Sequence, residues 1–389
     1  MFKNKTLIYG LTLNAIRSLT IAFSVFYMMA YGLSLEQVGF IKAFQAALIF
    51  FLDVPLSYLA DKISRRFSVL AAGLCSAIWL FLMAGAHNFA QFLLAELFNS
   101  FSLLLFSGTF VAYLLDNRND SFSVEVTLSH YNQYGKMGMA LFCLIGSTFA
   151  TIHSRWTWIL AGGAMLICCL WGVIYLPRDH NRITALKRTL KEDLNYLHSH
   201  LQSHQGSRLG LIFWQYVIAL LLLQVMIQYW QPYAFGTQPT IQYGLAFGIY
   251  FSILLAVQAY GAYFFRQGYK HKNLIQGTVF TIILAVSLWA SISYNYIGLI
   301  ISGALLFFIG QLMVLETSAE FHKCIASDLR ATMDSIVSSI YRLFLIGILP
   351  GVTWLMMKWG WFVFPSFCAL GLIVRYFLKL GQIINKPSP

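Results

Sequence analysis

Ionisable side chains inside long apolar runs are the residues of this 389-residue chain best placed to do chemistry. A charged group near the centre of a bilayer costs roughly 2.5–3.5 kcal/mol on insertion scales, so each one needs a partner or a watery cavity. We therefore expect these side chains to pair with one another or to line a wet site. They are Arg17, Lys42, Asp53, Glu96, Lys136, Glu316, Glu320, Asp334 and Arg342.

Two polar stripes lie in the same kind of run. One follows a single face of the first run over about five helical turns, and the other repeats glutamine at i, i+4 and i+7. Lipid rejects such faces, so both stripes should face protein or water. They consist of Asn14, Arg17, Ser24 and Tyr31, and of Gln224, Gln228 and Gln231.

The elements that must position these residues are membrane helices. The chain is 59% hydrophobic and only 10% charged, whereas soluble domains carry about 25% charged residues. A transmembrane helix needs about 20 mostly apolar residues, and twelve such runs are present. The predicted spans are 7–33, 36–60, 67–86, 89–115, 131–153, 156–176, 209–232, 242–265, 274–292, 297–321, 332–357 and 361–380.

Basic residues predict the orientation of these spans. Short loops rich in Lys and Arg stay on the cytoplasmic side, and nearly all basic residues fall on one side if both termini are cytoplasmic. The predicted outward loops then hold only Arg155 and Lys358. The net charge of +12 is thus a topology signal and a contact with anionic lipids, rather than a nucleic-acid footprint. We expect no cleavable signal peptide, because Lys3 and Lys5 lead into a run long enough to remain as a span.

One long polar segment divides six spans from six. Leucines in 177–208 recur every three or four residues while basic residues occupy other faces, which predicts an amphipathic helix on the cytoplasmic surface. The predicted domains are therefore a six-helix bundle over 1–176, the linker helix over 177–208 and a second bundle over 209–389.

The stretch 49–70 carries a charged turn between two apolar runs. Asp53-Val54-Pro55, followed by Leu59-Ala60-Asp61-Lys62-x-x-Arg65-Arg66, resembles the loop between helices 2 and 3 of the major facilitator superfamily, with Ser57 and Ser64 in place of its two glycines. The segments 32–39 and 330–350 are similar to two further parts of that family. The resemblance implies two bundles with internal repeats, a central cavity lined by helices 1, 2, 4, 5, 7, 8, 10 and 11, and a monomer.

The resemblance also implies a cytoplasmic latch. Relatives carry an acid at the foot of helix 4 that pairs with the loop arginine when the transporter is closed to the cytoplasm, and Asp116 occupies that place here. We therefore predict that Asp61, Arg65 and Asp116 form a gating group, whose ion pair forms in one state of the transporter and breaks in the other.

These observations predict a secondary active transporter rather than an enzyme. The sequence lacks a nucleotide-binding G-x-x-x-x-G-K-[ST] loop, so the driving force should be an ion gradient, with protons the first choice. The candidate proton carriers are the membrane carboxylates Asp53, Glu96, Glu316 and Glu320. The candidate substrate-binding residues are Asn14, Arg17, Lys42, Gln224, Gln228 and Arg342.

The predicted substrate is a small organic anion or zwitterion, a class that includes carboxylate-type metal chelators (siderophores). Arg17 and Arg342 would hold a carboxylate or phosphate bidentately if they converge near mid-membrane. A structural role for Arg342 is an equal alternative, because relatives often carry arginine there. Lys42 and Glu96 lie at similar depth and either neutralise each other or serve the site.

Other functions stay open. A proton-driven exporter of drugs or lipophiles is favoured by the many aromatic residues, although helix 5 lacks the G-P-x-x-x-G-G pattern of such antiporters. A transport-dead sensor or membrane enzyme is a further alternative. We expect no cofactor and no metal: the six cysteines read as core residues, and His198, His200 and His204 as a solvated helical face.

Overall fold

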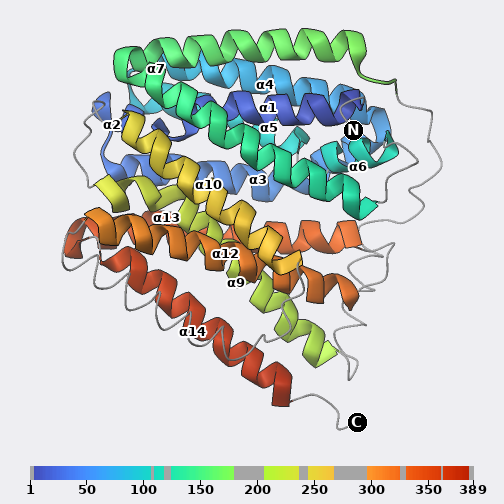
Figure 1. Ribbon diagram of the computed structural model, residues 1–389, viewed down its shortest axis with the longest axis vertical. Coiled ribbons are helices and arrows are strands. Elements are labelled where there is room, and N and C mark those ends of the chain that lie inside the picture. Colours follow the sequence, from blue (N-terminus) through green and yellow to red (C-terminus); the bar gives the residue numbers. More distant parts are fainter. Residues whose placement is uncertain are drawn as a thin grey trace. The chain divides into compact units, whose positions relative to one another are not determined.

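The computed structural model describes residues 4–106, 109–117, 124–178, 206–235, 244–266, 296–324, 330–360 and 362–384. These residues form helices and the short connections between them (Figure 1). The helices of the first half are α1 (Lys5–Ile21), α2 (Ser24–Ala30), α3 (Leu35–Ile63), α4 (Arg65–Gly85), α5 (Phe89–Phe106), α6 (Thr109–Asp116) and α7 (Val124–Tyr175). Those of the second half are α9 (Gly206–Phe235), α10 (Gly244–Arg266), α12 (Tyr296–Lys323), α13 (Arg330–Trp359) and α14 (Val363–Ile384).

The helices agree with the apolar runs of the sequence. Each predicted span overlaps a helix except 274–292, which lies outside the described residues. Within the described ranges, eight helices are long and apolar enough to cross a membrane, or nine if the bent pair α1 and α2 is one span. The chain is therefore a multi-pass, all-helical membrane protein, while the count of twelve and the cytoplasmic termini stay predictions.

One predicted span is bent, and two others are joined into one helix across a kink. The first run bends by 40° between α1 and α2. Two other spans, 131–153 and 156–176, are joined in α7, whose backbone leaves the helical region at His153 (φ −149°, ψ 90°). The expected outward loop between them is thus hardly longer than a single residue.

Local capping explains where several helices begin. Asn4 Oδ1 accepts from the Leu7 N–H at 3.1 Å at the start of α1, and Ser64 Oγ accepts from the Phe67 N–H at 3.0 Å at the start of α4. Ser34 and Gln37 form a reciprocal capping box at the start of α3, with bonds of 3.0 and 3.2 Å.

The described chain divides into two compact units. The first contains Met1–Arg182 and Thr237–Ala259, and the second contains Ile183–Gly236 and Tyr260–Pro389. Most of α10 therefore belongs to the first unit. The predicted boundaries at 176 and 208 stay predictions, because the linker segment 179–205 lies outside the described residues.

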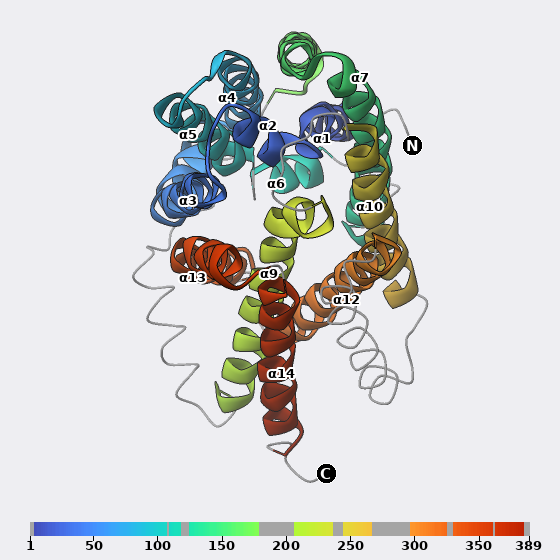
Figure 2. The ribbon, with the colours of Figure 1, turned by 90° about the vertical axis from the view of Figure 1, so that its left-hand side faces the viewer.

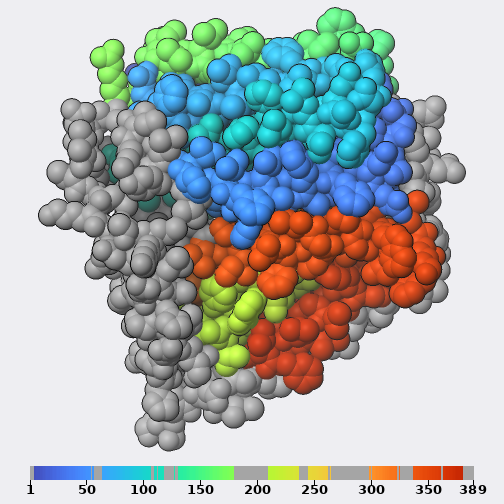
Figure 3. Space-filling view, turned by 180° about the vertical axis from the view of Figure 1, so that it is seen from behind, coloured from blue at the N-terminus to red at the C-terminus, as the bar shows by residue number. Residues whose placement is uncertain are grey.

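In the first unit, α5 lies between α3 and α4, and α7 contacts both α4 and α1. Figure 2 shows these helices nearly end-on, with α1 beside α6 and α7. Exposed apolar side chains of the first unit include Phe40, Phe51, Phe67 and Leu74. Figure 3 shows one face of this unit, on which atoms of α3, α4 and α5 lie at the surface. So many exposed large apolar residues are expected where lipid, rather than water, is the solvent.

Helices α1 and α7 run parallel and come very close. Gly135 lies near Leu11, and Gly146 lies near Leu19, so the contacts advance along both helices in the same direction. A Cβ atom on Gly146 would lie far inside van der Waals contact distance of the Leu19 carbonyl oxygen. Only glycine allows this approach of two backbones.

The second unit is formed by α9 with α12, α13 and α14. One core cluster joins α9 to α12 and α13, through residues such as Ile212, Phe321 and Val337. Tyr229 donates its hydroxyl to the Leu349 carbonyl oxygen at 2.5 Å, which ties α9 to α13 inside the apolar layer.

Candidate functional site

Arg17 on α1 lies within a group of neutral oxygens contributed by α4 and α5. Its Nη1 donates to Ser76 Oγ at 2.5 Å and to Ser102 Oγ at 2.9 Å, and its Nη2 donates to Asn99 Oδ1 at 2.5 Å. The guanidinium carbon lies 4.8 Å from the ring centroid of Trp79, a cation–π distance. Arg17 is thus well solvated by side chains but makes no ion pair with a carboxylate among the described residues.

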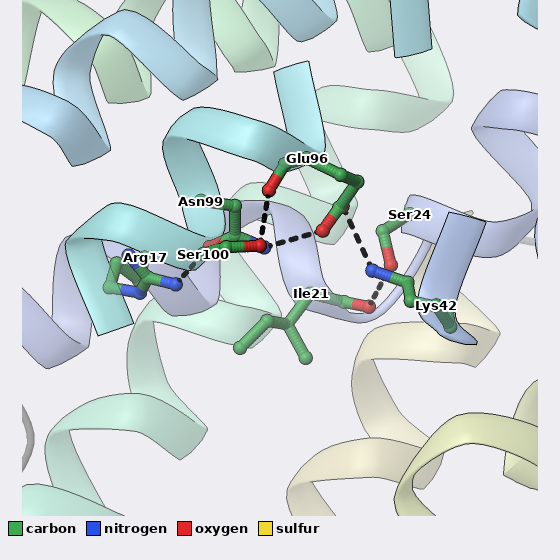
Figure 4. A network of polar contacts seen from close by, with 7 residues as sticks. All are labelled: Arg17, Ile21, Ser24, Lys42, Glu96, Asn99 and Ser100. Carbon is green, nitrogen blue, oxygen red and sulfur yellow. Dashed lines mark hydrogen bonds and ion pairs between the residues drawn. The ribbon is translucent and has the colours of Figure 1, made fainter. Parts of the chain in front are cut away.

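A chain of polar contacts continues from Arg17 to α3, as Figure 4 shows. Asn99 Nδ2 donates to Glu96 Oε2 at 2.9 Å, and Lys42 Nζ donates to Glu96 Oε1 at 2.9 Å. The Glu96 side chain is 1% exposed and that of Lys42 is 12% exposed. The network therefore connects α1, α3, α4 and α5 through one buried carboxylate.

This network carries an excess positive charge. Arg17 and Lys42 are cations, and Glu96 is the one carboxylate that contacts either of them in the described part of the chain. Asp53 is also buried on α3, three turns beyond Lys42. The Lys42–Glu96 ion pair satisfies one cation, so the charge of Arg17 is balanced by dipoles alone.

A second polar group joins α7 to its neighbours in the first unit. Asn14 Nδ2 donates to the Tyr131 hydroxyl at 2.8 Å. Lys136 Nζ donates to Gln258 Oε1 on α10 at 2.6 Å. Both Asn14 and Lys136 are half-buried, so these polar atoms are not sealed from the surroundings.

In the second unit, Glu316 on α12 is held by two cations of α14. Its oxygens accept from Arg375 Nη2 at 2.8 Å and from Lys379 Nζ at 2.6 Å. The Arg342 guanidinium lies over the ring of Tyr341, 5.4 Å from its centroid. Glu320 is half-buried on the last turns of α12.

Gln224 and Gln228 lie on α9, and both are half-buried. Neither side chain hydrogen-bonds to another of the described residues. Their assignment to the substrate site stays a prediction.

The predicted latch residues lie at the ends of α3, α4 and α6. Arg65 Nη1 donates to Asp116 Oδ2 at 2.7 Å, with side chains 31% and 34% exposed. The pair brings together residues 51 positions apart. Asp61 belongs to α3, but its side chain lies outside the described residues.

Comparisons with known proteins agree on one family. The family model described as Major Facilitator Superfamily matches residues 6–333. The chain belongs to the Major Facilitator Superfamily. This confirms the resemblance found in the loop 49–70 and its companion segments. No match was found among curated proteins.

Solved structures of superfamily transporters share the fold of this chain. The nucleoside transporter NupG has a TM-score of 0.75 and 16% identity, with 98% of each chain covered. A POT family transporter in complex with 5-aminolevulinic acid has a TM-score of 0.74 and 13% identity, covering 98% of this chain and 96% of that one. A bacterial homolog of the human lysosomal transporter Spinster, inward-facing and occupied, has a TM-score of 0.72 and 14% identity, covering 100% and 98%. Identities this low establish the fold alone.

Within this superfamily fold, the structure brings together some of the predicted site residues. Arg17, Lys42 and Glu96 belong to one network, and Lys42 and Glu96 form an ion pair within it. Whether the pair also serves the site stays a prediction. Glu316 lies in a separate ion-pair cluster. The predicted convergence of Arg17 with Arg342 concerns residues of different units and stays a prediction, as do the assigned roles.

Several polar residues of the site were not predicted. Ser76, Ser102 and Tyr131 hydrogen-bond to predicted site residues. Hydroxyl groups are common in membrane helices, so the sequence alone does not mark these three as part of a site. Gln258 is a lone amide in an apolar run. Lys136 was recognisable as a membrane charge, but its partner depends on how α7 packs against α10.

The described residues contain no cluster of three or more His, Cys, Asp or Glu side chains arranged to hold a metal ion. A small pocket in the first unit is lined by aromatic and uncharged residues, and its size excludes a drug-sized ligand in this structure. It is lined by Phe23, Phe26, Tyr27, Ala150, Ser154, Gly244 and Phe247.

Proposed function

We propose that this protein is a secondary active transporter that moves a small organic anion or zwitterion across the cytoplasmic membrane. It works as a monomer, by alternating access of its two bundles, with protons as the coupling ion and with both termini cytoplasmic. Carboxylate-type metal chelators belong to the substrate class. Membership of the transporter superfamily supports the general function, and the polar network supports the substrate class.

The observation that carries the proposal is the unbalanced charge of Arg17. Its three hydrogen-bond acceptors are neutral, and the nearby carboxylate of Glu96 is already paired with Lys42. A cation held within the membrane by dipoles alone attracts an anion strongly, because the low dielectric weakens screening. A substrate carboxylate would make the network neutral.

Glu96 is the carboxylate best suited to couple this anion to a proton. Protonation would break its ion pair with Lys42 and leave the network with two unbalanced cations. The anion then binds more tightly, and by linkage a bound anion favours the proton. Glu316 is less suited because two cations hold its oxygens; Asp53 and Glu320 remain further candidates.

The ion pair between Arg65 and Asp116 fits the proposed cytoplasmic latch. An exposed pair of this kind contributes little to stability, about 0–1 kcal/mol, but that is enough to bias two states of similar free energy. We assign Asp61 to the same latch on its position in the loop sequence alone.

Uptake by proteoliposomes tests the proposal. With an inside-alkaline pH gradient, we expect accumulation of at least one of labelled succinate, citrate and 5-aminolevulinate, and loss of accumulation when a protonophore collapses the gradient. Arg17→Ala should lower uptake about 10- to 100-fold, the range of one charge-assisted hydrogen bond, and Arg17→Lys should retain part of it. Lys358→Gln is the matched control, because Lys358 contacts Trp354 and Trp359 at the end of α13.

Two results would contradict the proposal. Unchanged uptake and affinity in Arg17→Ala would show that Arg17 does not bind the substrate anion. Full-rate accumulation without any proton or sodium gradient would show that transport is not coupled to an ion gradient.

The many aromatic side chains favour a second function, proton-driven export of drugs or lipophiles. In the first unit they pack against one another, as Phe26 and Phe247 do with ring centroids 4.8 Å apart. Extrusion of tetraphenylphosphonium from inverted vesicles, together with no uptake of any of the three anions, would favour this exporter over the anion transporter.

A further inference from the structure

Asn99 is the side chain through which Arg17 and Glu96 are connected. Its Oδ1 accepts from Arg17 Nη2 at 2.5 Å, and its Nδ2 donates to Glu96 Oε2 at 2.9 Å. Asn99 is 4% exposed and lies between the guanidinium and the carboxylate in Figure 4. One end of its amide therefore contacts the proposed anion-binding cation, and the other end contacts the proposed proton carrier.

These two neighbours determine the orientation of the amide. A guanidinium only donates hydrogen bonds and an ionised carboxylate only accepts them. Oδ1 must therefore face Arg17, and Nδ2 must face Glu96. A rotation of the amide by half a turn would place two donors together at Arg17 and two acceptors together at Glu96. The observed orientation thus belongs to the ionised state of Glu96.

A proton on Glu96 reverses this preference. Lys42 Nζ donates to Oε1 at 2.9 Å, so the proton binds to Oε2, which then faces the Nδ2 donor of Asn99. Rotation of the amide removes the conflict, because Oδ1 then accepts from the new hydroxyl group. The same rotation turns Nδ2 toward Arg17, whose Nη2 loses its acceptor while its Nη1 keeps two serine hydroxyls. Protonation of Glu96 therefore leaves Arg17 with an unsatisfied donor.

We propose that Asn99 couples the proton to the anion: its amide rotates when Glu96 takes up a proton, and Arg17 Nη2 becomes free for a substrate carboxylate. This inference rests on the proposed function, and it makes Asn99 a positioning residue that acts through Arg17. A carboxylate satisfies Nη2 and also balances the charge of Arg17, which an amide does not do. By linkage, a bound anion favours the proton on Glu96.

The ionisable groups around Glu96 determine how a change in anion affinity is assigned. Lys42 of α3 contacts Glu96 directly, and Arg17 of α1 is connected to it through Asn99. Helix α4 contributes Ser76 and Trp79 to the network, and both are uncharged. The ionisable groups farther along the packed elements are Tyr27 and Tyr31 of α2, His87 before α5, Asp53 of α3, and the Arg65–Asp116 pair of α4 and α6. An effect that requires both Glu96 and Asn99 therefore belongs to this network.

A double-mutant cycle on anion binding tests the inference. Binding of succinate, citrate and 5-aminolevulinate is measured at neutral pH as thermal stabilisation of the purified protein in detergent, without any gradient. Glu96→Gln imitates the protonated acid, because a glutamine accepts from Lys42 and donates to Asn99. It should bind at least one of these anions about 10- to 100-fold more tightly than the wild type, the range of one hydrogen bond to a charged group.

Asn99→Leu removes both hydrogen bonds of the amide at a similar side-chain volume. In this background the gain in affinity from Glu96→Gln should shrink at least about tenfold, because only the through-space effect of one charge remains. Asn99→Asp repeats the cycle with a side chain of the same size that still accepts from Arg17, and the gain should shrink there as well. Ser102→Ala is the matched control: it removes an acceptor of Arg17 that has no described contact with Glu96, so the full gain should persist.

The inference and the proposed function fail in different ways. An equal gain from Glu96→Gln in the wild-type, Asn99→Leu and Asn99→Asp backgrounds overturns the inference, because Asn99 then only holds Arg17 in place. No gain in the wild-type background, or a gain lost equally in Ser102→Ala, overturns it as well. Anion uptake by proteoliposomes that survives any of these results leaves the proposed function standing. Absence of both binding and uptake of all three anions in the wild type overturns the proposed function, and the inference with it.

Discussion

Replacing Lys42 with methionine would leave the carboxylate of Glu96 buried without its cation. The Glu96 side chain is 1% exposed and its Oε1 lies 2.9 Å from Lys42 Nζ. Its other oxygen keeps only the amide of Asn99. We therefore expect Lys42→Met to be strongly destabilising, although methionine fits the apolar surroundings well.

The size of the effect follows from the geometry. At 2.9 Å and an effective dielectric constant near 20, the attraction of the pair is about 6 kcal/mol before desolvation. Removing one partner of a buried pair typically costs about 3–5 kcal/mol, whereas removing both is nearly neutral. Lys42→Met should thus lose about 3–5 kcal/mol, and Lys42→Met with Glu96→Gln should lose about 1–2 kcal/mol.

The free energy of unfolding, obtained by titrating the protein with SDS in mixed micelles, measures these losses. Four proteins form the cycle: wild type, each single variant, and the double variant. Leu74→Met, at a lipid-exposed position of α4, controls for the introduced methionine. Equal losses in Lys42→Met and in the double variant would refute the reasoning, because they would mean that the lost charge partner is not what destabilises the protein.

Two further groups of ion pairs give predictions of opposite kind. Arg65→Ala and Asp116→Ala should each leave the free energy of unfolding within about 1 kcal/mol of wild type. Both should shift the equilibrium between the states closed and open to the cytoplasm toward the open state, by up to about fivefold. Spin-label distances between the bundles measure this shift, and unequal effects of the two variants would contradict the latch. Glu316→Gln should destabilise by about 3–5 kcal/mol because Arg375 and Lys379 both lose their carboxylate, whereas Lys379→Gln should cost less since Arg375 remains; SDS titration compares the two variants.

The sequence predicted the helices well because the bilayer dictates their length and composition. Each long apolar run had one structural solution, a helix whose backbone groups bond internally. The break at His153 was placed correctly between two spans. Its form was not predicted, since a single residue that leaves the helical region gives no compositional signal.

The contacts of the candidate site were less predictable. Lys42 and Glu96 could be paired because their depths agree and charges in lipid need partners. The neutral partners of Arg17, such as Ser76 and Asn99, depend on how α4 and α5 rotate against α1. Hydropathy fixes which residues are in the membrane, but not the azimuth of each helix, and therefore not which side chains meet.

The meeting of Gly146 with the Leu19 carbonyl has a mechanical consequence. Two backbones this close leave little room for one helix to slide or roll against the other at this point, since the residues beside Gly146 on α7 carry a Cβ atom and Gly146 does not. Helix α1 and the part of α7 before His153 must then move as one rigid body. Arg17 and Lys136 lie on these two helices, so they move together and keep a constant distance during any conformational change.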